Sequence, residues 1–287
     1  MARGDAERSV VLEVGPDDDE TMPVVLRPLR TTEDYRRCVE LQRLTWGESF
    51  GECVPISLLM ISQKVGGVTA GAFDSDGRMV GMVYGLTGPR RGRLVHWSHM
   101  LAVSEEFRGR GLGRELKLYQ RQVVRDRGVE TMLWTYDPLV ARNAHLNIVR
   151  LGARPVEYVR DLYGSDTTSS LHAGLGTDRF VVEWRLADGG PAAADPDLWS
   201  SAIVLNVDDD GEPLPSPLGA EGGRRVRVEI PLDIHELEPK RDATRRRWRE
   251  STRAALEWCL AEGYRVLGFD CSTPARRCWY LLARGPR

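Results

Sequence analysis

The chain has 287 residues, which allows one large domain or two modest ones with ample room for a core. Its 40 basic and 42 acidic residues nearly balance, and this argues against a polyanion-binding protein as a whole. No apolar run approaches the roughly 18 residues that a membrane span needs. The acidic stretch 15–20 fits neither a signal peptide nor a transit peptide. We therefore expect a cytoplasmic protein with no nucleic-acid partner and no membrane partner.

Five cysteines are scattered along the chain, and none of them forms a C-x-x-C pair. This spacing predicts neither a disulfide framework nor a zinc site. Reduced and mostly buried thiols are expected instead. The five positions are Cys38, Cys53, Cys259, Cys271 and Cys278.

Residues 1–22 are predicted to be a loosely ordered lead-in with a short strand at 10–14. Hydrophobic periodicity and turn residues then predict a regular order of strands and helices up to residue 186. The predicted strands are 24–29, 69–73, 79–85, 94–103, 131–136, 155–163 and 179–186, and the predicted helices are 31–46, 55–65, 112–128 and 141–151. This order predicts an α/β domain at 23–186 that is built around a mixed sheet.

A stretch rich in Pro, Ala and Asp at 187–198 is predicted to be a linker. Beyond it, 199–287 is predicted to form a C-terminal β/α lobe, with a long helix within 242–262. The most basic run of the chain, 240–249, leads into this helix. Glutamates are interspersed and Trp248 can join an apolar face, so we interpret the run as a solvated helix face. Contact with nucleic acid is the less favoured interpretation.

The stretch His99–Glu115 combines a strand, an Arg/Gly turn and a helix. Alternating apolar residues lead into Arg108-Gly109-Arg110-Gly111-Leu112-Gly113, and apolar residues then repeat at helical spacing. Glycine lets the backbone approach a ligand closely, and the free N–H groups of a first helical turn point at phosphates. Together with the arginines at 108, 110 and 114, this stretch predicts an anion site.

Arg108, Gly111 and Gly113 form a pattern that resembles the acyl-CoA-binding motif of the GNAT superfamily of N-acetyltransferases, Arg/Gln-x-x-Gly-x-Gly/Ala. The dinucleotide motif G-x-G-x-x-G does not fit, because its third glycine would fall on Arg114 or Leu116, and no P-loop lysine follows. The resemblance implies the GNAT fold, with a mixed central sheet flanked by helices and the C-terminal β/α lobe as an extension. It also implies acyl-CoA as co-substrate and no metal. The residues expected to bind the co-substrate are Leu101, Ala102, Val103, Arg108, Gly109, Arg110, Gly111, Leu112, Gly113, Arg114 and Asn143.

A narrower resemblance rests on Trp134-Thr135-Tyr136-Asp137-Pro138, on Ala141-Arg142-Asn143-Ala144-His145, on Leu162-Tyr163-Gly164 and on Thr177-Asp178-Arg179-Phe180. These runs look like a subgroup of predicted acetyltransferases. Some members of that subgroup transfer a succinyl group from succinyl-CoA to amino acids and are associated with N-succinylamino acid racemases. The resemblance supports an acyltransferase firmly and an amino-acid substrate only loosely.

His99 is the candidate base. Strand alternation predicts that Trp97, His99, Leu101 and Val103 share one face of the central strand. Arylalkylamine N-acetyltransferases, which share the Leu-Ala-Val before the turn, carry histidines at the positions of Trp97 and His99. An unperturbed histidine pKa of about 6.5 suits removal of a proton from an ammonium group. A structural histidine bonded to the backbone is an equally good interpretation of His99.

The acid that protonates the leaving thiolate is harder to place. The superfamily's usual tyrosine slot holds Ile148 in this chain. Tyr136 and Tyr163 are the substitutes, and Tyr163 is favoured because it lies in a subgroup motif. The alternative for either tyrosine is an aromatic residue of the core.

Three further residues are candidates for the ligand pockets. Asn143 corresponds to an Asn that often hydrogen-bonds the CoA amide chain, although a helix-capping or surface role is nearly as good an interpretation. Arg142 and Arg179 are candidates to bind a free carboxylate of the donor or acceptor in a bidentate manner. Trp97 is assigned to the substrate side. For both arginines a plain surface position is the alternative.

The sequence therefore predicts an acyl-CoA-dependent N-acyltransferase that acts on a small-molecule amine by direct ternary-complex transfer. No cysteine lies in the motif segments, which disfavours a covalent thiol intermediate. Two alternatives stay open: an acetyltransferase of another amine or of a protein N-terminus, and a non-catalytic CoA-binding regulatory module. A homodimer through the C-terminal strands is also left open by the sequence.

Overall fold

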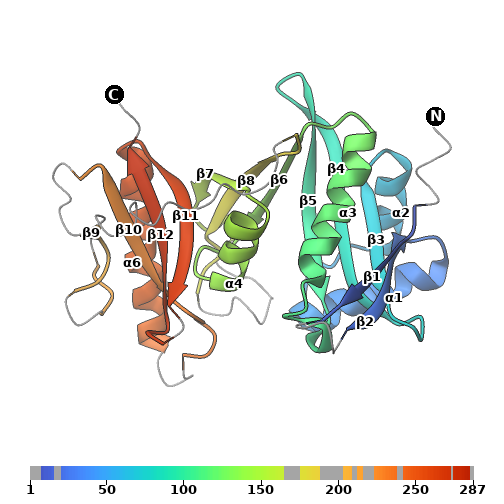
Figure 1. Ribbon diagram of the computed structural model, residues 1–287, viewed down its shortest axis with the longest axis horizontal. Helices are drawn as coiled ribbons and strands as arrows, with labels where there is room; N and C mark the ends of the chain where they lie inside the picture. The colour runs from blue at the N-terminus through green and yellow to red at the C-terminus, as the bar shows by residue number, and fades with distance from the viewer. Residues whose placement is uncertain are drawn as a thin grey trace. The chain divides into compact units, whose positions relative to one another are not determined.

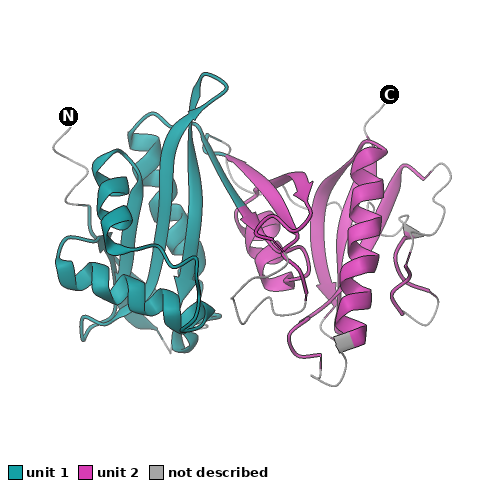
Figure 2. Ribbon diagram, turned by 180° about the vertical axis from the view of Figure 1, so that it is seen from behind, with its two compact units in different colours: residues 1–134, 168–170, 185–188 teal, residues 135–167, 171–184, 189–287 magenta. Residues whose placement is uncertain are grey.

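A computed structural model describes residues 8–15, 21–164, 175–187, 203–208, 212–215, 223–237, 242–272 and 274–284. The chain divides into two compact units (Figure 2). Unit 1 comprises 1–134, 168–170 and 185–188, and unit 2 comprises 135–167, 171–184 and 189–287. The division falls inside the segment that was predicted as one domain. Most of the predicted linker at 187–198 lies outside the described residues, so the boundary there stays a prediction.

Unit 1 is built on a mixed sheet with the strand order β1-β2-β3-β4-β5-β6. Neighbouring strands are antiparallel except β5 and β6, which run parallel. The strands are β1 (Val10–Val14), β2 (Met22–Pro28), β3 (Val68–Phe73), β4 (Met79–Arg90), β5 (Arg93–Val103) and β6 (Thr131–Tyr136), the last of which continues into unit 2. The helices are α1 (Thr32–Trp46), α2 (Ile56–Lys64), the 3-10 turn η2 (Glu105–Phe107) and α3 (Leu112–Asp126). These elements follow the predicted order.

Helix α1 begins where its sequence predicts. The Thr31 hydroxyl accepts the Asp34 N–H at 3.1 Å, and the Asp34 carboxylate accepts the Thr31 N–H at 3.1 Å. This reciprocal capping box satisfies N–H groups that the first helical turn leaves free. Arg27 also binds the Asp34 carboxylate through two nitrogens, at 2.8 and 2.9 Å. Burial alone would raise the pKa of Asp34, but these hydrogen bonds hold it well below its ordinary value.

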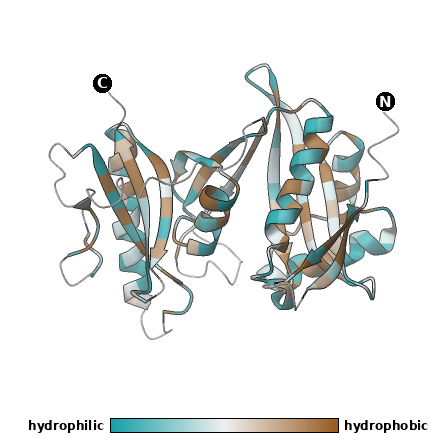
Figure 3. Ribbon diagram, in the orientation of Figure 1, coloured by the Kyte–Doolittle hydropathy of each residue, from teal (hydrophilic) through white to brown (hydrophobic). Residues whose placement is uncertain are grey.

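The two faces of the unit 1 sheet are covered by different helices (Figure 1). Tyr84 of β4 lies on the face of α2, where its hydroxyl is 2.8 Å from Ser62 Oγ. The opposite face carries Gly81, which packs against Leu116 of α3. Along α3 the apolar residues form one side, and Figure 3 shows both hydrophobic and hydrophilic residues on this helix. Each face thus buries a separate apolar layer.

A β-bulge interrupts the pairing of β4 with β5. Tyr84 pairs with Met100, and the next residue, Gly85, pairs with Ser98, so His99 is the extra residue. A bulge of this kind puts one unpaired residue into a strand and breaks its alternation. The predicted shared face is therefore wrong. The alternation of side chains between the two faces is offset by one residue across His99. Trp97 therefore lies on the α2 face, whereas Leu101 and Val103 lie on the α3 face.

Unit 2 begins with the end of β6 and a short helical region. The sequence predicts one α-helix at 141–151, but the structure has α4 (Ala141–Ala144) followed by a π-helical turn η3 (His145–Arg150). The Leu151 N–H reaches back five residues to the Leu146 carbonyl at 3.0 Å, which is the wider π spacing. Strands β7 (Arg154–Val159) and β8 (Arg179–Arg185) follow and pair antiparallel.

The C-terminal part of unit 2 forms a second sheet with the order β11-β12-β10-β9, as the prediction of a β/α extension requires. Helix α6 (Asp242–Ala261) packs against β10 and β11. The strands are β9 (Ile203–Val204), β10 (Arg225–Pro231), β11 (Tyr264–Ser272) and β12 (Arg277–Arg284).

Two predictions about this lobe are wrong. Cys271 and Cys278, expected as free thiols, form a disulfide, because the register of β11 and β12 places them directly opposite each other. The basic run is not only a solvated face. Arg249 of α6 is buried, and Arg253 one turn later is half-buried. Within the described ranges, none of the helices combines the length and the apolar character that crossing a bilayer requires.

Candidate active site

The Arg/Gly turn leads from the end of β5 into α3. Gly109 and Gly111 have φ values of +77° and +81°, a backbone region that favours glycine. A Cβ atom at either position would meet no protein atom within 4 Å, so the backbone is open there. Gly111 is the N-cap of α3 and offers no side chain to its first turn. The turn therefore presents N–H groups at the positive end of a 15-residue helix, as an anion site requires.

The arginines of this turn are held by neighbouring groups. Arg108 Nε donates to the Val103 carbonyl at 3.2 Å, and Arg110 Nε donates to the Glu106 carbonyl at 3.2 Å. Both contacts use Nε and tie each side chain to the segment between β5 and α3. Arg114 is paired with Glu115 at 2.7 Å. Each of the three basic side chains is thus held by a group near it in sequence, between the end of β5 and the first turn of α3.

The pairing of β5 with β6 ends shortly before the bulge. The parallel pairing covers only Val95 to Trp97 of β5, opposite 131–133 of β6. From Ser98 to Val103, no described strand pairs with that edge of β5. Backbone groups on an unpaired strand edge can bind a ligand. This open edge contains Leu101–Val103, the stretch predicted to polarise the thioester carbonyl.

His99 lies at the bulge with an exposed side chain. Its ring contacts the Tyr84 ring edge-on, with 6.0 Å between the ring centroids. Partial desolvation by neighbouring atoms lowers the pKa of His99, and the charge of Glu52 partly opposes this shift. The imidazole is therefore uncharged at neutral pH and can accept a proton.

Sequence reasoning missed a polar cluster beneath β5, on the face of α3. Lys117 of α3 is 4% exposed, and its amine donates to Ser98 Oγ at 2.7 Å. The same amine lies over the Trp134 ring, 3.9 Å from the centroid. One helical turn further, the Gln120 amide contacts His96 Nε2 at 2.9 Å. The only sequence signal was a lysine and a glutamine beside the apolar positions of α3.

The hydrogen bonds fix the state of His96, which is fully buried. The Thr87 hydroxyl donates to the Gly66 carbonyl at 2.8 Å, so its oxygen accepts from His96 Nδ1 at 2.9 Å. Nε2 is then left to accept from Gln120. Burial, with the neighbouring basic groups Lys117 and Arg127, lowers the pKa of His96 to about 3. His96 is thus a neutral structural histidine.

The other predicted site residues lie in unit 2. The Tyr163 hydroxyl is 3.2 Å from the Thr135 hydroxyl of β6. Arg179 is buried, lies 5.3 Å from the Tyr163 ring centroid, and is 3.8 Å from the Asp137 carboxylate. On α4, Arg142 is exposed and Asn143 is half-buried. Unit 2 therefore brings Tyr163 and Arg179 together.

The two alternative positions for a general acid are buried. Ile148, in the usual tyrosine slot, belongs to the π-helical turn and is 9% exposed. Tyr136 packs against Phe180, and burial raises its pKa. Its surroundings are those of an aromatic core residue.

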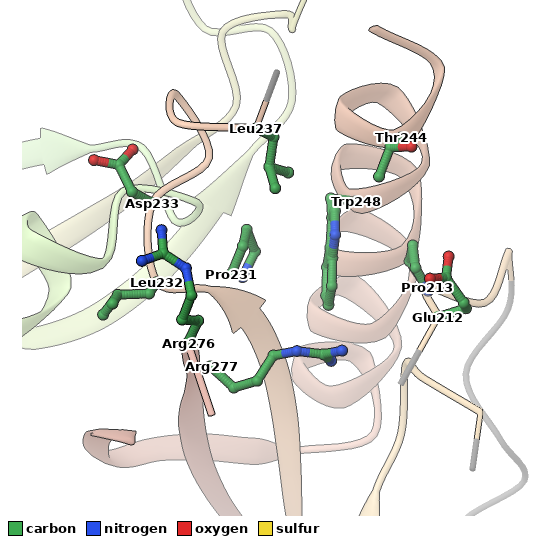
Figure 4. Close-up of a pocket in the computed structure, with 10 residues that line it drawn as sticks. All are labelled: Glu212, Pro213, Pro231, Leu232, Asp233, Leu237, Thr244, Trp248, Arg276 and Arg277. Carbon is green, nitrogen blue, oxygen red and sulfur yellow. The ribbon is translucent and has the colours of Figure 1, made fainter. Parts of the chain in front are cut away.

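A pocket of about 190 Å³ lies in unit 2, and none of the predicted site residues lines it (Figure 4). Trp248 of α6 and Pro231 at the end of β10 form part of its wall. Its two arginines already have partners, since Arg277 pairs with Glu229, and Arg276 pairs with Glu236 at 2.6 Å. The full lining is Glu212, Pro213, Pro231, Leu232, Asp233, Leu237, Thr244, Trp248, Arg276 and Arg277.

Solved structures similar to this chain include three acetyltransferases, and the comparison with curated proteins gives no match. The ribosomal-protein-S18-alanine N-acetyltransferase from Escherichia coli has 16% identity and a TM-score of 0.45, with 60% of this chain and 99% of that chain covered. Arabidopsis thaliana Naa50, in complex with a bisubstrate analogue, has 15% identity and a TM-score of 0.45, with 56% and 97% covered. A GNAT-family acetyltransferase from Streptococcus pneumoniae has 13% identity and a TM-score of 0.45, with 56% and 99% covered.

The family comparison gives one match, to the Acetyltransferase (GNAT) family, over residues 35–146. This segment runs from α1 through the Arg/Gly turn and α3 to the beginning of η3. It contains the bulged strand, the open edge of β5 and the glycines of the turn, on the fold that the sequence predicts. Residues 35–146 thus match the model of the Acetyltransferase (GNAT) family, within a chain that carries an additional C-terminal sheet.

Proposed function

We propose that this protein is an acyl-CoA-dependent N-acyltransferase that transfers an acetyl or succinyl group to the amino group of a small molecule, with an amino acid as the favoured acceptor. The observation that carries the proposal is the unpaired edge of β5 that leads directly into the Arg/Gly turn. One segment of chain offers donors for a thioester carbonyl, and the next offers a helix N-terminus for phosphates.

The reaction is a direct transfer in a ternary complex. The acceptor nitrogen, as a free amine, attacks the thioester carbonyl and forms a C–N bond, and the C–S bond then breaks. His99 takes the proton that the ammonium group loses, and its lowered pKa favours the uncharged form that this step needs. The departing CoA thiolate needs a proton, and Tyr163 is the proposed donor.

The acceptor side is assigned to Trp97, Arg142 and Arg179. Arg142 is exposed and has the freedom to bind a carboxylate in a bidentate manner. Arg179 already lies near Asp137, so a substrate carboxylate would have to share it. We therefore assign the carboxylate contact to Arg142 first. Asn143, next to it on α4, is proposed to bind the amide chain of CoA.

The test is release of free thiol, with acetyl-CoA and succinyl-CoA compared against D- and L-amino acids and against simple amines. Release with succinyl-CoA and an amino acid supports the full proposal. Release only with acetyl-CoA and other amines or N-terminal peptides would support the acyltransferase activity and rule out an amino acid as the acceptor. Arg93→Ala, an exposed substitution at the β4–β5 turn, serves as a control that should retain activity.

The second candidate function is a CoA-binding regulatory module without catalysis. The buried Ile148 in the usual tyrosine slot favours it. Such a module would bind CoA saturably in calorimetry and release no thiol with any acceptor. His99→Ala gives a further test. In an enzyme, loss of this base should change the rate–pH profile and leave CoA binding unchanged.

A further inference from the structure

A lysine lies where the pairing of β5 with β6 ends. The last paired residues are Trp97 and Leu133, so Ser98 and Trp134 are the first residues beyond the pairing. Lys117 of α3 contacts both, through the Ser98 hydroxyl at 2.7 Å and the Trp134 ring at 3.9 Å. The side chain of Lys117 thus connects α3 with both strands at the point where their pairing ends.

Lys117 has no acidic partner among the described residues. The polar groups around it are Ser98 and His96 from β5, the Trp134 ring from β6 and Gln120 from its own helix, and Arg127 lies near His96. None of these is a carboxylate. The face of the Trp134 ring favours an ammonium, but full burial without a carboxylate opposes it and favours the uncharged amine. Accordingly, burial lowers the pKa of Lys117 well below its ordinary value.

We propose that Lys117 is a positioning residue for acyl transfer that works as an uncharged amine, holding Ser98 against Trp134 where β5 leaves β6. The inference rests on the proposed function, since it concerns the same open edge of β5. Ser98 directly precedes the bulge residue His99, so fixing Ser98 fixes where the strand bulges and where its free N–H groups point. Lys117 itself is buried and does not touch the substrates.

The state of the amine follows from this geometry. The uncharged amine donates one hydrogen to Ser98 and lies against the aromatic ring without a counter-ion. A protonated Lys117 would have to draw water or a carboxylate beneath β5, and this would separate α3 from the sheet. Transfer should therefore require the uncharged form, whereas binding of CoA at the turn should depend on it much less.

The test compares two variants. Lys117→Met keeps an unbranched side chain but has no amine, and Lys117→Arg keeps a permanent positive charge. Lys64→Met, at an exposed position on α2, is the matched control. We expect Lys117→Met to lower kcat about three- to tenfold, the scale of one lost hydrogen bond, with KM for acyl-CoA unchanged. Lys117→Arg should lower kcat by about a hundredfold or more, as expected for an uncompensated buried charge. Equal kcat values for Lys117→Met and Lys117→Arg would overturn the proposal.

A second measurement does not depend on activity or on the stability of Lys117→Arg. The NMR signal of the Lys117 side chain in the wild-type protein, assigned by its loss in Lys117→Met, should report an uncharged amine at neutral pH. A titration at the ordinary lysine pKa would overturn the proposal. If the wild-type protein releases no thiol but Lys117 is uncharged, the proposed function is wrong. The inference that Lys117 is an uncharged amine in the folded protein would still hold.

Discussion

Helix α3 of unit 1 and helix α6 of unit 2 both bury basic side chains, but they do so in opposite ways. Lys117 of α3 has a hydroxyl and an aromatic ring as neighbours. Arg249 of α6 binds the Asp137 carboxylate through two nitrogens, at 3.0 and 2.6 Å. One turn later Arg253 binds Asp178 in the same manner, at 2.8 and 2.6 Å. Among the residues that the structure describes, unit 1 thus buries an amine without a carboxylate beside it, and unit 2 pairs its basic side chains with buried carboxylates.

The difference follows from the chemistry of the two side chains. A lysine can lose its proton when it is buried, whereas an arginine stays charged and needs a carboxylate. Burial by itself would raise the pKa of Asp137, but Arg249 and Arg179 hold it below its ordinary value. The ion pairs of unit 2 therefore persist until the pH falls below the ordinary carboxyl range. The lysine site of unit 1 responds to pH at the other end of the scale.

The largest effect is expected when one ion pair of unit 2 is broken. Arg249→Met removes the bidentate partner of the buried Asp137 carboxylate and leaves it only the more distant Arg179, at 3.8 Å, and this should cost about 3 kcal/mol of unfolding free energy. Urea denaturation measures the loss. The double variant Asp137→Leu/Arg249→Met should recover part of it, because the carboxylate is removed together with its main partner while Arg179 loses a neighbouring carboxylate. A single variant as stable as the wild type would show that Arg249 is not buried against Asp137.

The lysine of unit 1 should give a pH-dependent stability. Its pKa is lowered in the folded state, so the unfolded chain binds more protons and the unfolding free energy rises with pH up to the ordinary value of 10.5. We expect the rise between neutral pH and pH 10 to be weaker in Lys117→Met. Denaturation of both proteins across this range measures it. Identical slopes would mean that Lys117 is charged in the folded protein.

The polar layer beneath β5 should be sensitive to a single methyl group. At Gly85 a Cβ atom would lie 2.3 Å from His96 Nε2 and 2.6 Å from the Trp97 carbonyl. Gly85→Ala should therefore cost about 1–3 kcal/mol, the usual penalty of overpacking. Gly88→Ala is the matched control, because nothing lies within 4 Å of a Cβ there. Thermal unfolding compares the two, and an equal loss in both would contradict the packing.

The smallest effect concerns the partner of the lysine. Ser98→Ala removes the hydroxyl that Lys117 contacts and should cost about 1 kcal/mol. If the proposed positioning role is correct, kcat should also fall while KM for acyl-CoA stays unchanged. A fall in stability without any change in kcat would reduce the contact to a structural one.

Most elements of the fold could be predicted because their signals are local. The start of α1 at Thr31 and the strand Val10–Val14 each depend on a few neighbouring residues. The Arg/Gly turn was likewise found from its own residues. Its role as an anion site stays a prediction, as do the roles of His99 and Tyr163.

The missed features depend on pairing between distant segments. Alternation assumes an unbroken strand, and the bulge at His99 is visible only in the register with β4. The contact of Arg249 with Asp137 joins residues that are 112 positions apart. The cysteine pair likewise depends on the register of β11 with β12. In each case the residue type was noted, but its partner could not be derived from local patterns.

The bulge also has a consequence for how β5 tolerates changes in length. Removing one residue from a regular strand moves everything beyond it to the opposite face. His99 is an inserted residue, so its deletion would leave Ser98 opposite Gly85 and Met100 opposite Tyr84 in a continuous ladder. The fold can therefore lose this residue and keep both of its cores, whereas deletion of the neighbouring Trp97 would disrupt the pairing. In β5, the position proposed for chemistry is also the one that the architecture can spare.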